Sequence, residues 1–161
     1  MTSPLKLEEP AKPGAGPVPD RNQSGALFVE NADGTGLHQI IPYGLANSHD
    51  NATESWSPNG NEILFAGVHG PFSGAGLYVV HTDGTGLRAI PLQIGGRSFA
   101  FTPRWSPDGS KIIFTLFTTK APGTGDEGIS TANADGSGLS QVTNGGGSDD
   151  FTDWGPHPSA I

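Results

Sequence analysis

The chain has 161 residues with no cysteine, 8 Lys and Arg, 16 Asp and Glu, and a formal net charge of −8. The length predicts one domain, and the lack of cysteine excludes a disulfide scaffold, a zinc finger and thiol catalysis. The acidic charge argues against a nucleic-acid binder, which needs a basic face. No run of 18 apolar residues could form a membrane-spanning helix, and residues 1–25 lack the apolar stretch of a signal peptide.

In chain order, a Pro- and Gly-rich segment comes first. Residues 1–24 are predicted to form a flexible tail, and residues 25–161 to hold the folded part. There, short runs of β-branched and aromatic residues alternate with turn residues, and no segment has a helical period over 11 residues or more. The predicted strands are 27–31, 37–42, 52–57, 62–67, 77–82, 87–91, 99–106, 111–118, 128–133, 139–143 and 150–155.

One turn motif occurs three times, as N-A-D-G-T-G-L at 31–37, H-T-D-G-T-G-L at 81–87 and N-A-D-G-S-G-L at 133–139. Its copies start 50 and then 52 residues apart. In each copy the Asp-Gly pair starts a hairpin, and the second glycine suits a left-handed backbone. Each copy therefore predicts a tight turn between two antiparallel strands.

A second motif has nearly the same period, with W-S-P-N-G at 56–60, W-S-P-D-G at 105–109 and a weakened W-G-P-H-P at 154–158. Its proline presets one dihedral angle, Asp or Asn bonds its own backbone, and glycine closes the turn. Two motifs that share a period near 50 indicate a repeat architecture, and four-stranded antiparallel units of this length are typical of β-propeller blades. The repeated tryptophans are interpreted as blade packing.

These paired turns resemble the WD-like repeats of TolB-like β-propellers, in which both turns mark every blade. The resemblance covers roughly residues 25–158, and residues 153–158 look like the close of such proteins. It implies an all-β fold of four-stranded antiparallel blades, with roughly three blades in this chain, a half-propeller. It also implies a periplasmic or extracellular protein, although no signal peptide is present.

The number of blades raises the question of ring closure. The family usually closes six or more blades, so the resemblance implies a head-to-tail homodimer in which two copies of three blades form one ring. The last strand of one copy would then join the first hairpin of the other. The alternative is that the sequence is the C-terminal half of a longer propeller.

The longer connections, at 43–52, 68–76, 92–98, 118–128 and 144–149, lie at the end of the blades opposite to the tight turns. Variable loops on a rigid scaffold are where binding normally resides. Phe72 and Tyr43 are candidate aromatic anchors for a partner. The candidate ligand- or partner-binding residues of this face are His49, Asp50, Asn51, His69, Phe72, Arg97, Asp126, Asp149 and Asp150.

Two interpretations of these polar loops stay open. They could form a partly acidic cup for a cation, a cationic peptide segment or a polar ligand, or they could be ordinary solvated loops. No metal-ligand spacing, phosphate-binding loop or nucleophile elbow is present, so the sequence predicts no cofactor, no metal and no catalytic residue.

The resemblance implies a non-catalytic scaffold that binds protein or peptide at the long-loop face and the channel mouth, with a second copy of itself as a partner. One alternative is a metal-assisted lyase or hydrolase-type propeller enzyme that uses His49, His69 and Arg97. Another is a truncated or designed fragment whose only property is assembly.

Overall fold

The structure, a computed structural model, describes residues 25–46, 54–67, 76–94, 98–121, 124–143, 149 and 152–155. The predicted tail at 1–24 lies outside these residues. Within them no helix occurs, and none is therefore long and apolar enough to cross a membrane. The strands are β1 (Gly25–Val29), β2 (His38–Ala46), β3 (Ser55–Trp56), β4 (Glu62–Gly67), β5 (Gly76–His81), β6 (Arg88–Ala89), β7 (Ser98–Trp105), β8 (Lys111–Ala121), β9 (Thr124–Asn133) and β10 (Ser140–Gln141).

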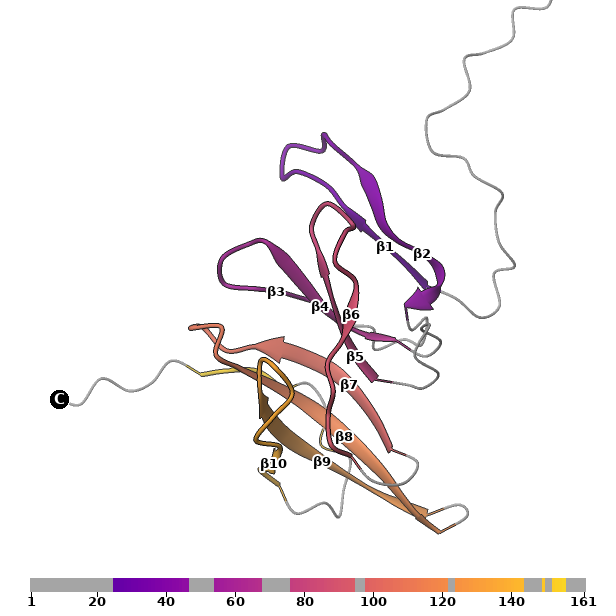
Figure 1. Cartoon of the computed structure of the whole chain (residues 1–161), viewed down its shortest axis with the longest axis vertical. Coiled ribbons are helices and arrows are strands. Elements are labelled where there is room, and N and C mark those ends of the chain that lie inside the picture. The colour runs from indigo at the N-terminus through magenta and orange to yellow at the C-terminus, as the bar shows by residue number, and fades with distance from the viewer. Residues whose placement is uncertain are drawn as a thin grey trace, which may run out of the picture.

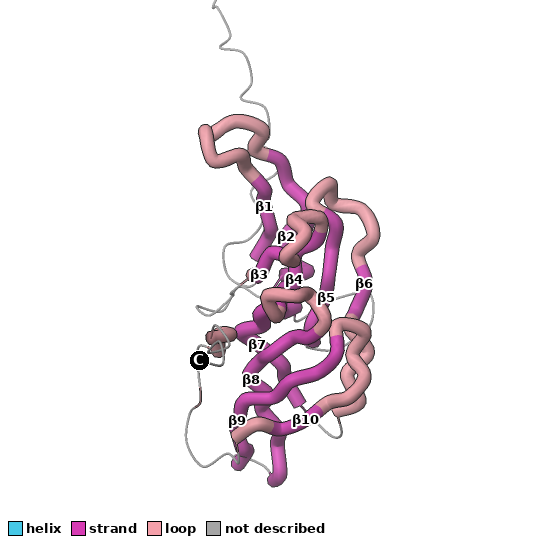
Figure 2. The backbone as a smooth tube through the Cα atoms, turned by 90° about the vertical axis from the view of Figure 1, so that its left-hand side faces the viewer, coloured by secondary structure: helices cyan, strands magenta, loops and turns pink. Residues whose placement is uncertain are grey.

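The strands form three antiparallel sheets that follow one another along the long axis of the molecule (Figures 1 and 2). The first is the hairpin β1–β2, the second has the order β3-β4-β5-β6, and the third has the order β7-β8-β9-β10. Every hydrogen-bonded neighbour is also the neighbour in the chain. The predicted all-β architecture of one hairpin and two four-stranded units is confirmed.

The first turn motif closes the hairpin through its aspartate. Asp33 Oδ1 accepts hydrogen bonds from the backbone N of Thr35 at 3.0 Å and from its hydroxyl at 2.6 Å. Asp83 and Asp135 repeat the arrangement in the other two copies. Because the hydroxyl and the backbone N–H stabilise the ionised carboxylate, the pKa of each of these three aspartates is lowered.

The second turn motif uses a serine and an acceptor two residues later. Ser106 donates its hydroxyl to Asp108 Oδ1 at 2.6 Å and accepts the backbone N–H of Lys111 at 2.9 Å. Together with Ser110, this serine lowers the pKa of Asp108 to about 2. The turn before β4 is built in the same way, with Asn59 in place of the aspartate. Both predicted turns are therefore present.

The middle sheet β3–β6 is covered on both faces, by the hairpin on one side and by the third sheet on the other. Successive residues of its strands point to opposite sides, so β4 and β5 each contribute to two apolar clusters. The cluster between this sheet and the hairpin contains Leu27, Ile40, Ile41, Ile63, Phe65, Tyr78 and Val80. The cluster between it and the third sheet contains Leu64, Ala66, Leu77, Val79, Ile90, Ala100, Trp105, Ile112, Phe114 and Ala132. Burying each large side chain stabilises the fold by about 1.5–3 kcal/mol.

The structure differs from the sequence prediction in two places. β8 and β9 stay paired as far as Ala121 and Thr124, so the loop predicted at 118–128 is largely a long hairpin. Residues 152–155, predicted to belong to a strand, are not in a sheet. They still run beside β7, where Thr152 Oγ1 donates to the Thr102 carbonyl oxygen at 3.1 Å.

Candidate functional site

Of the nine residues predicted to form the long-loop site, the structure describes Asp126 and Asp149. The side chain of Tyr43 is outside the described residues, although its backbone belongs to β2. The other seven predicted residues also lie outside them: His49, Asp50, Asn51, His69, Phe72, Arg97 and Asp150. The convergence of these side chains on one ligand therefore stays a prediction.

Asp126 and Asp149 have different surroundings. Asp126 lies on β9 with Thr118 of β8 as its Cα partner, in a strand rather than in the predicted loop. Asp149 lies outside the sheets and is half-buried, and its Oδ2 accepts the Thr143 hydroxyl at 2.6 Å. The structure thus places Asp126 near the tip of a hairpin and ties Asp149 to the end of the third sheet.

A buried threonine network surrounds the Asp149 backbone. The Thr115 hydroxyl donates to the Asp149 carbonyl oxygen at 3.2 Å, and the Thr102 and Thr115 hydroxyls are 2.9 Å apart. Because Thr115 uses its only hydrogen on Asp149, Thr102 must be the donor to Thr115. The Thr102 carbonyl in turn accepts from Thr152. The network therefore ties Asp149 and Thr152 to the third sheet.

Thr102 is held in a strained backbone conformation, with φ of 51°. A β-branched residue rarely adopts positive φ, and such strain persists only where surrounding contacts enforce it. Here the register between β7 and β8 shifts between Phe101 and Arg104. Sequence reasoning missed this site, because no residue in the F-T-P-R string signals a left-handed threonine.

The two tryptophans of the well-formed W-S-P turns differ in burial. Trp105 is 8% exposed and belongs to the cluster between the second and third sheets, whereas Trp56 is 52% exposed. The backbone N of Trp105 also donates to Ser55 Oγ of the preceding sheet at 3.1 Å. In the described residues only the hairpin β1–β2 precedes Trp56, so this tryptophan has no complete sheet to pack against.

A second pair of equivalent aromatic residues shows the same contrast. Phe28 and Tyr78 lie 50 residues apart, three residues before each copy of the turn motif. Tyr78 is 4% exposed beneath the hairpin, whereas Phe28 is 48% exposed on the side of the hairpin that faces away from the middle sheet. Leu37 is exposed as well, while its equivalent Leu87 packs against the cluster beneath the hairpin. We call Phe28, Leu37 and Trp56 the leading face.

The opposite end of the molecule has its own open surface. Val142 is 59% exposed, whereas its repeat equivalents Ile40 and Ile90 are 5% and 7% exposed. Phe99 is also exposed and packs on Phe117, with 6.3 Å between ring centroids. Because Ile112 and Phe114 of β8 face the middle sheet, the alternation turns Phe117 away from it. We call Phe99, Phe117 and Val142 the trailing face.

These two faces hold all five large apolar side chains that are exposed within the described residues. At equivalent positions inside the chain, Tyr78, Trp105 and Ile90 are covered by a neighbouring sheet. Each end therefore presents side chains of the kind that a neighbouring blade covers elsewhere.

No protein-family model and no curated protein matches the sequence. Solved structures do match. One assigned as TolB from Agrobacterium tumefaciens has a TM-score of 0.51 and 17% identity over 71% of this chain, and TolB from Acinetobacter baumannii has a TM-score of 0.50 and 20% identity over 74%. The chain has a TolB-like β-propeller fold. It spans 39% and 26% of the length of those two structures.

The boundaries between blades of this propeller are not alike. At the first boundary, His38 Nδ1 lies 2.7 Å from the Gly36 carbonyl oxygen and Nε2 lies 3.1 Å from the Thr82 carbonyl oxygen. Both partners only accept, so both ring nitrogens donate when the ring is protonated. The Gly36 and Thr82 carbonyls accordingly raise the pKa of His38. Protonated His38 therefore bridges the first hairpin to the next blade.

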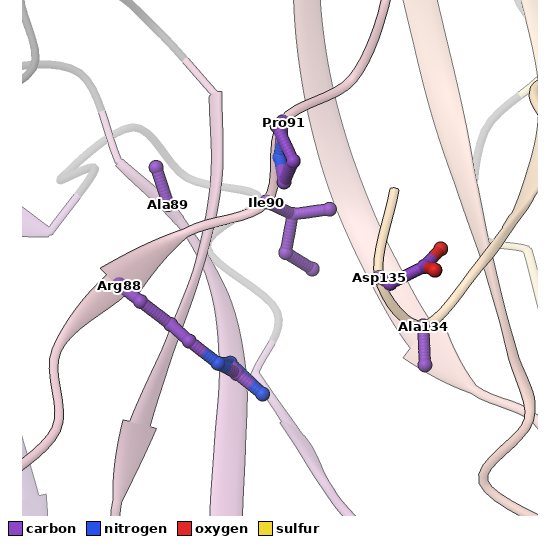
Figure 3. Close-up of a pocket in the computed structure, with 6 residues that line it drawn as sticks. All are labelled: Arg88, Ala89, Ile90, Pro91, Ala134 and Asp135. Carbon is purple, nitrogen blue, oxygen red and sulfur yellow. The ribbon is translucent and has the colours of Figure 1, made fainter. Parts of the chain in front are cut away.

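At the second boundary Arg88 occupies the position of His38. Its Nη2 donates to Glu62 Oε1 of its own blade at 3.1 Å. Beside it lies a cleft of about 410 Å³ between the end of β6 and the turn of the next blade, with Ile90 and Pro91 on one side and Ala134 and Asp135 on the other (Figure 3). The cleft lies at this second boundary, where Arg88 stands at the position of the bridging histidine His38.

Within the part of the chain that the structure describes, no three His, Asp or Glu side chains are close enough together to hold a metal ion. The chemistry available there is apolar packing at the two open faces and hydrogen bonding along the strands and turns.

Proposed function

We propose that the chain is a non-catalytic β-propeller scaffold that closes into a six-bladed ring with a second copy of itself. The ring would bind protein or peptide at the long-loop face and the channel mouth. The observation that carries this proposal is the pair of equivalent tryptophans, one buried by a neighbouring blade and one 52% exposed. Each open face carries the kind of residues that a neighbouring blade covers elsewhere in the same chain.

The two ends would supply three of the four strands of one blade. Residues 152–155 run beside β7 as the innermost strand of a following blade would, and the hairpin β1–β2 supplies the two outer strands of a blade. A heterologous contact of this kind generates a ring when the rotation closes. The five exposed apolar side chains are already about half buried in one chain. Covering the rest contributes about 0.8–1.5 kcal/mol each and offsets part of the association cost, which is about 4–15 kcal/mol.

Binding at the long-loop face would follow from charge as well as from loop geometry. The net charge of −8 favours a neutral or basic partner through electrostatic steering. Asp126 lies near this end of the third blade, on the hairpin β8–β9. A basic peptide segment therefore fits this face better than an acidic one.

Light scattering across protein concentrations tests the ring. We expect a mass of about twice 16.6 kDa at micromolar concentration. Phe99→Glu should reduce this mass to that of one chain while circular dichroism still shows folded β-sheet, and Phe99→Tyr should keep the larger mass. A wild-type mass of one chain at every concentration would refute ring closure.

Peptide selection tests the loop face separately. Basic peptides selected from a random library against the wild-type protein should lose affinity for Asp126→Lys and keep it for Glu30→Lys, which changes charge equally at the tight-turn end. Peptides that bind both variants alike would argue against a binding site at the long-loop face.

A further inference from the structure

Neighbouring blades meet through one recurring contact between a turn glycine and the last strand segment of the blade before it. A Cβ atom added to Gly84 would lie 3.3 Å from the Ile40 backbone, and one added to Gly136 would lie 3.0 Å from Ile90 Cγ2. Such distances are tighter than ordinary van der Waals contact. Glycine is therefore needed at this joint for close approach as well as for its positive φ of 83° at Gly84.

The same joint exists in two unpaired halves at the ends of the described chain. Gly34 is the first glycine of the earliest motif copy. Among the described residues, and apart from its two chain neighbours, only Glu30 Oε1 lies within 4 Å of the position of its Cβ. Val142 follows Ile90 by 52 residues, the same offset that separates Gly84 from Gly136. Val142 is therefore the residue on which the turn of a following blade would lie.

We propose that Gly34 of one copy packs on Val142 of a second copy and fixes the register in which the two chains join. This inference rests on the ring closure proposed above and names the contact that makes it. Gly34 has a φ of 82°, close to the 83° of Gly84 and the 87° of Gly136, so its turn already has the shape that the joint requires. In the same register Phe28 meets the trailing face, as Tyr78 meets the hairpin.

The joint between copies differs chemically from the two joints within a chain. The repeat position that holds His38 at the first boundary and Arg88 at the second holds Ser140 at the third. Because Ser140 stands there, the contact between copies has no cationic side chain at this repeat position. Its stability comes from apolar packing of Val142, Phe99 and Phe117, so salt should weaken it little.

The absence of cysteine from the sequence makes disulfide trapping a clean test. The variant Gly34→Cys/Val142→Cys should form a covalent dimer on mild oxidation at micromolar protein, visible on a non-reducing gel, because oxidation traps the pair although the added Cβ weakens the contact. The matched control is Ile40→Cys/Gly84→Cys, which places the same pair within one chain. There the added Cβ atom lies 3.7 Å from the Ile40 Cβ, within the range of natural disulfides.

Single variants establish the direction of the contact. Gly34→Cys alone and Val142→Cys alone should stay monomeric on the gel, whereas a mixture of the two should give dimers. Dimers from either single variant alone would overturn the head-to-tail contact. A ladder of longer polymers would support the contact and refute closure by two copies.

A second pair of variants gives an equilibrium readout. Gly34→Ala should raise the dimer dissociation constant about tenfold or more, because the added methyl group meets the strand of the other copy. Gly60→Ala is the matched control: Gly60 has a similar φ of 73° and nothing within 4 Å of its Cβ position. Equal effects of the two substitutions would overturn the inference, even if the wild-type protein is a dimer. A wild-type monomer would instead refute the ring itself.

Discussion

The middle blade and the two ends of the molecule carry the same repeat but bury it differently. In the middle blade, Tyr78 and Ile90 lie on opposite faces and both are covered by neighbouring sheets. At the ends, Phe28 and Val142 occupy the same two repeat positions and are open. The difference shows that burial in a repeat protein is decided by the neighbouring unit and not by the residue itself.

The largest effect should come from truncating an aromatic side chain of the middle blade. Phe65→Ala removes a ring buried between the hairpin and β4–β5, and we expect it to lower the free energy of unfolding by about 3–5 kcal/mol. Phe99→Ala, on the trailing face, should lower it by less than about 1 kcal/mol when measured in nanomolar protein, where copies are dissociated. Urea denaturation followed by circular dichroism compares them. Equal losses would remove the distinction between covered and open faces.

The next effect concerns the exposed tryptophan. In a Trp105→Phe/Trp154→Phe background, Trp56 is the only fluorophore of its type. Its emission should shift to shorter wavelength as the concentration rises from nanomolar to micromolar, because a second copy would cover it. Trp56→Ala should raise the dissociation constant about tenfold, equivalent to 1.4 kcal/mol. An emission maximum that does not change with concentration would contradict coverage of the leading face.

A smaller effect should follow from the threonine network. Thr115→Val removes the hydroxyl that accepts from Thr102 and donates to the Asp149 carbonyl, so we expect a loss of about 1–2 kcal/mol in unfolding free energy. Thr115→Ser keeps the hydroxyl and should retain most of the stability. Hydrogen exchange should show faster opening of residues 152–155 in the valine variant alone. Unchanged exchange there would mean that the network does not hold this segment.

The smallest effect should be the pH dependence of the first boundary. The pKa of His38 is raised in the folded chain, so its bridge contributes fully below the ordinary value of 6.5 and is lost as pH rises through the folded pKa. Asp83 nearby also favours the protonated ring. Imidazole NMR titration should give a pKa of His38 above 6.5. His38→Ser should abolish the pH dependence of amide hydrogen-exchange protection in the hairpin β1–β2. His81→Asn, which installs the residue found in the other motif copies, should keep it.

The sequence was sufficient to predict the fold because its turn chemistry repeats. Each Asp-Gly turn has its own internal hydrogen bonds, such as those from Thr35 to Asp33, so its structure can be inferred without knowing the rest of the chain. Two such turns at one period are enough to define a four-stranded unit. The order of strands followed from the same reasoning.

Other features could not be predicted in this way. The extension of the β8–β9 hairpin runs through Thr119 and Gly125, which carry no alternating apolar pattern. The left-handed Thr102 is imposed by contacts distant in sequence, including Thr152. The contrast between Trp56 and Trp105 depends on the unit that precedes each of them, which the nearly identical local strings do not encode.

The glycine joint between blades has a consequence for how such a chain can grow. Each repeat carries a turn glycine that fits the unit before it and an apolar residue, such as Ile90, that receives the unit after it. A tandem gene duplication would copy both halves of the joint at once. A newly duplicated blade would then find its partner surface already present, without compensating mutations elsewhere in the gene.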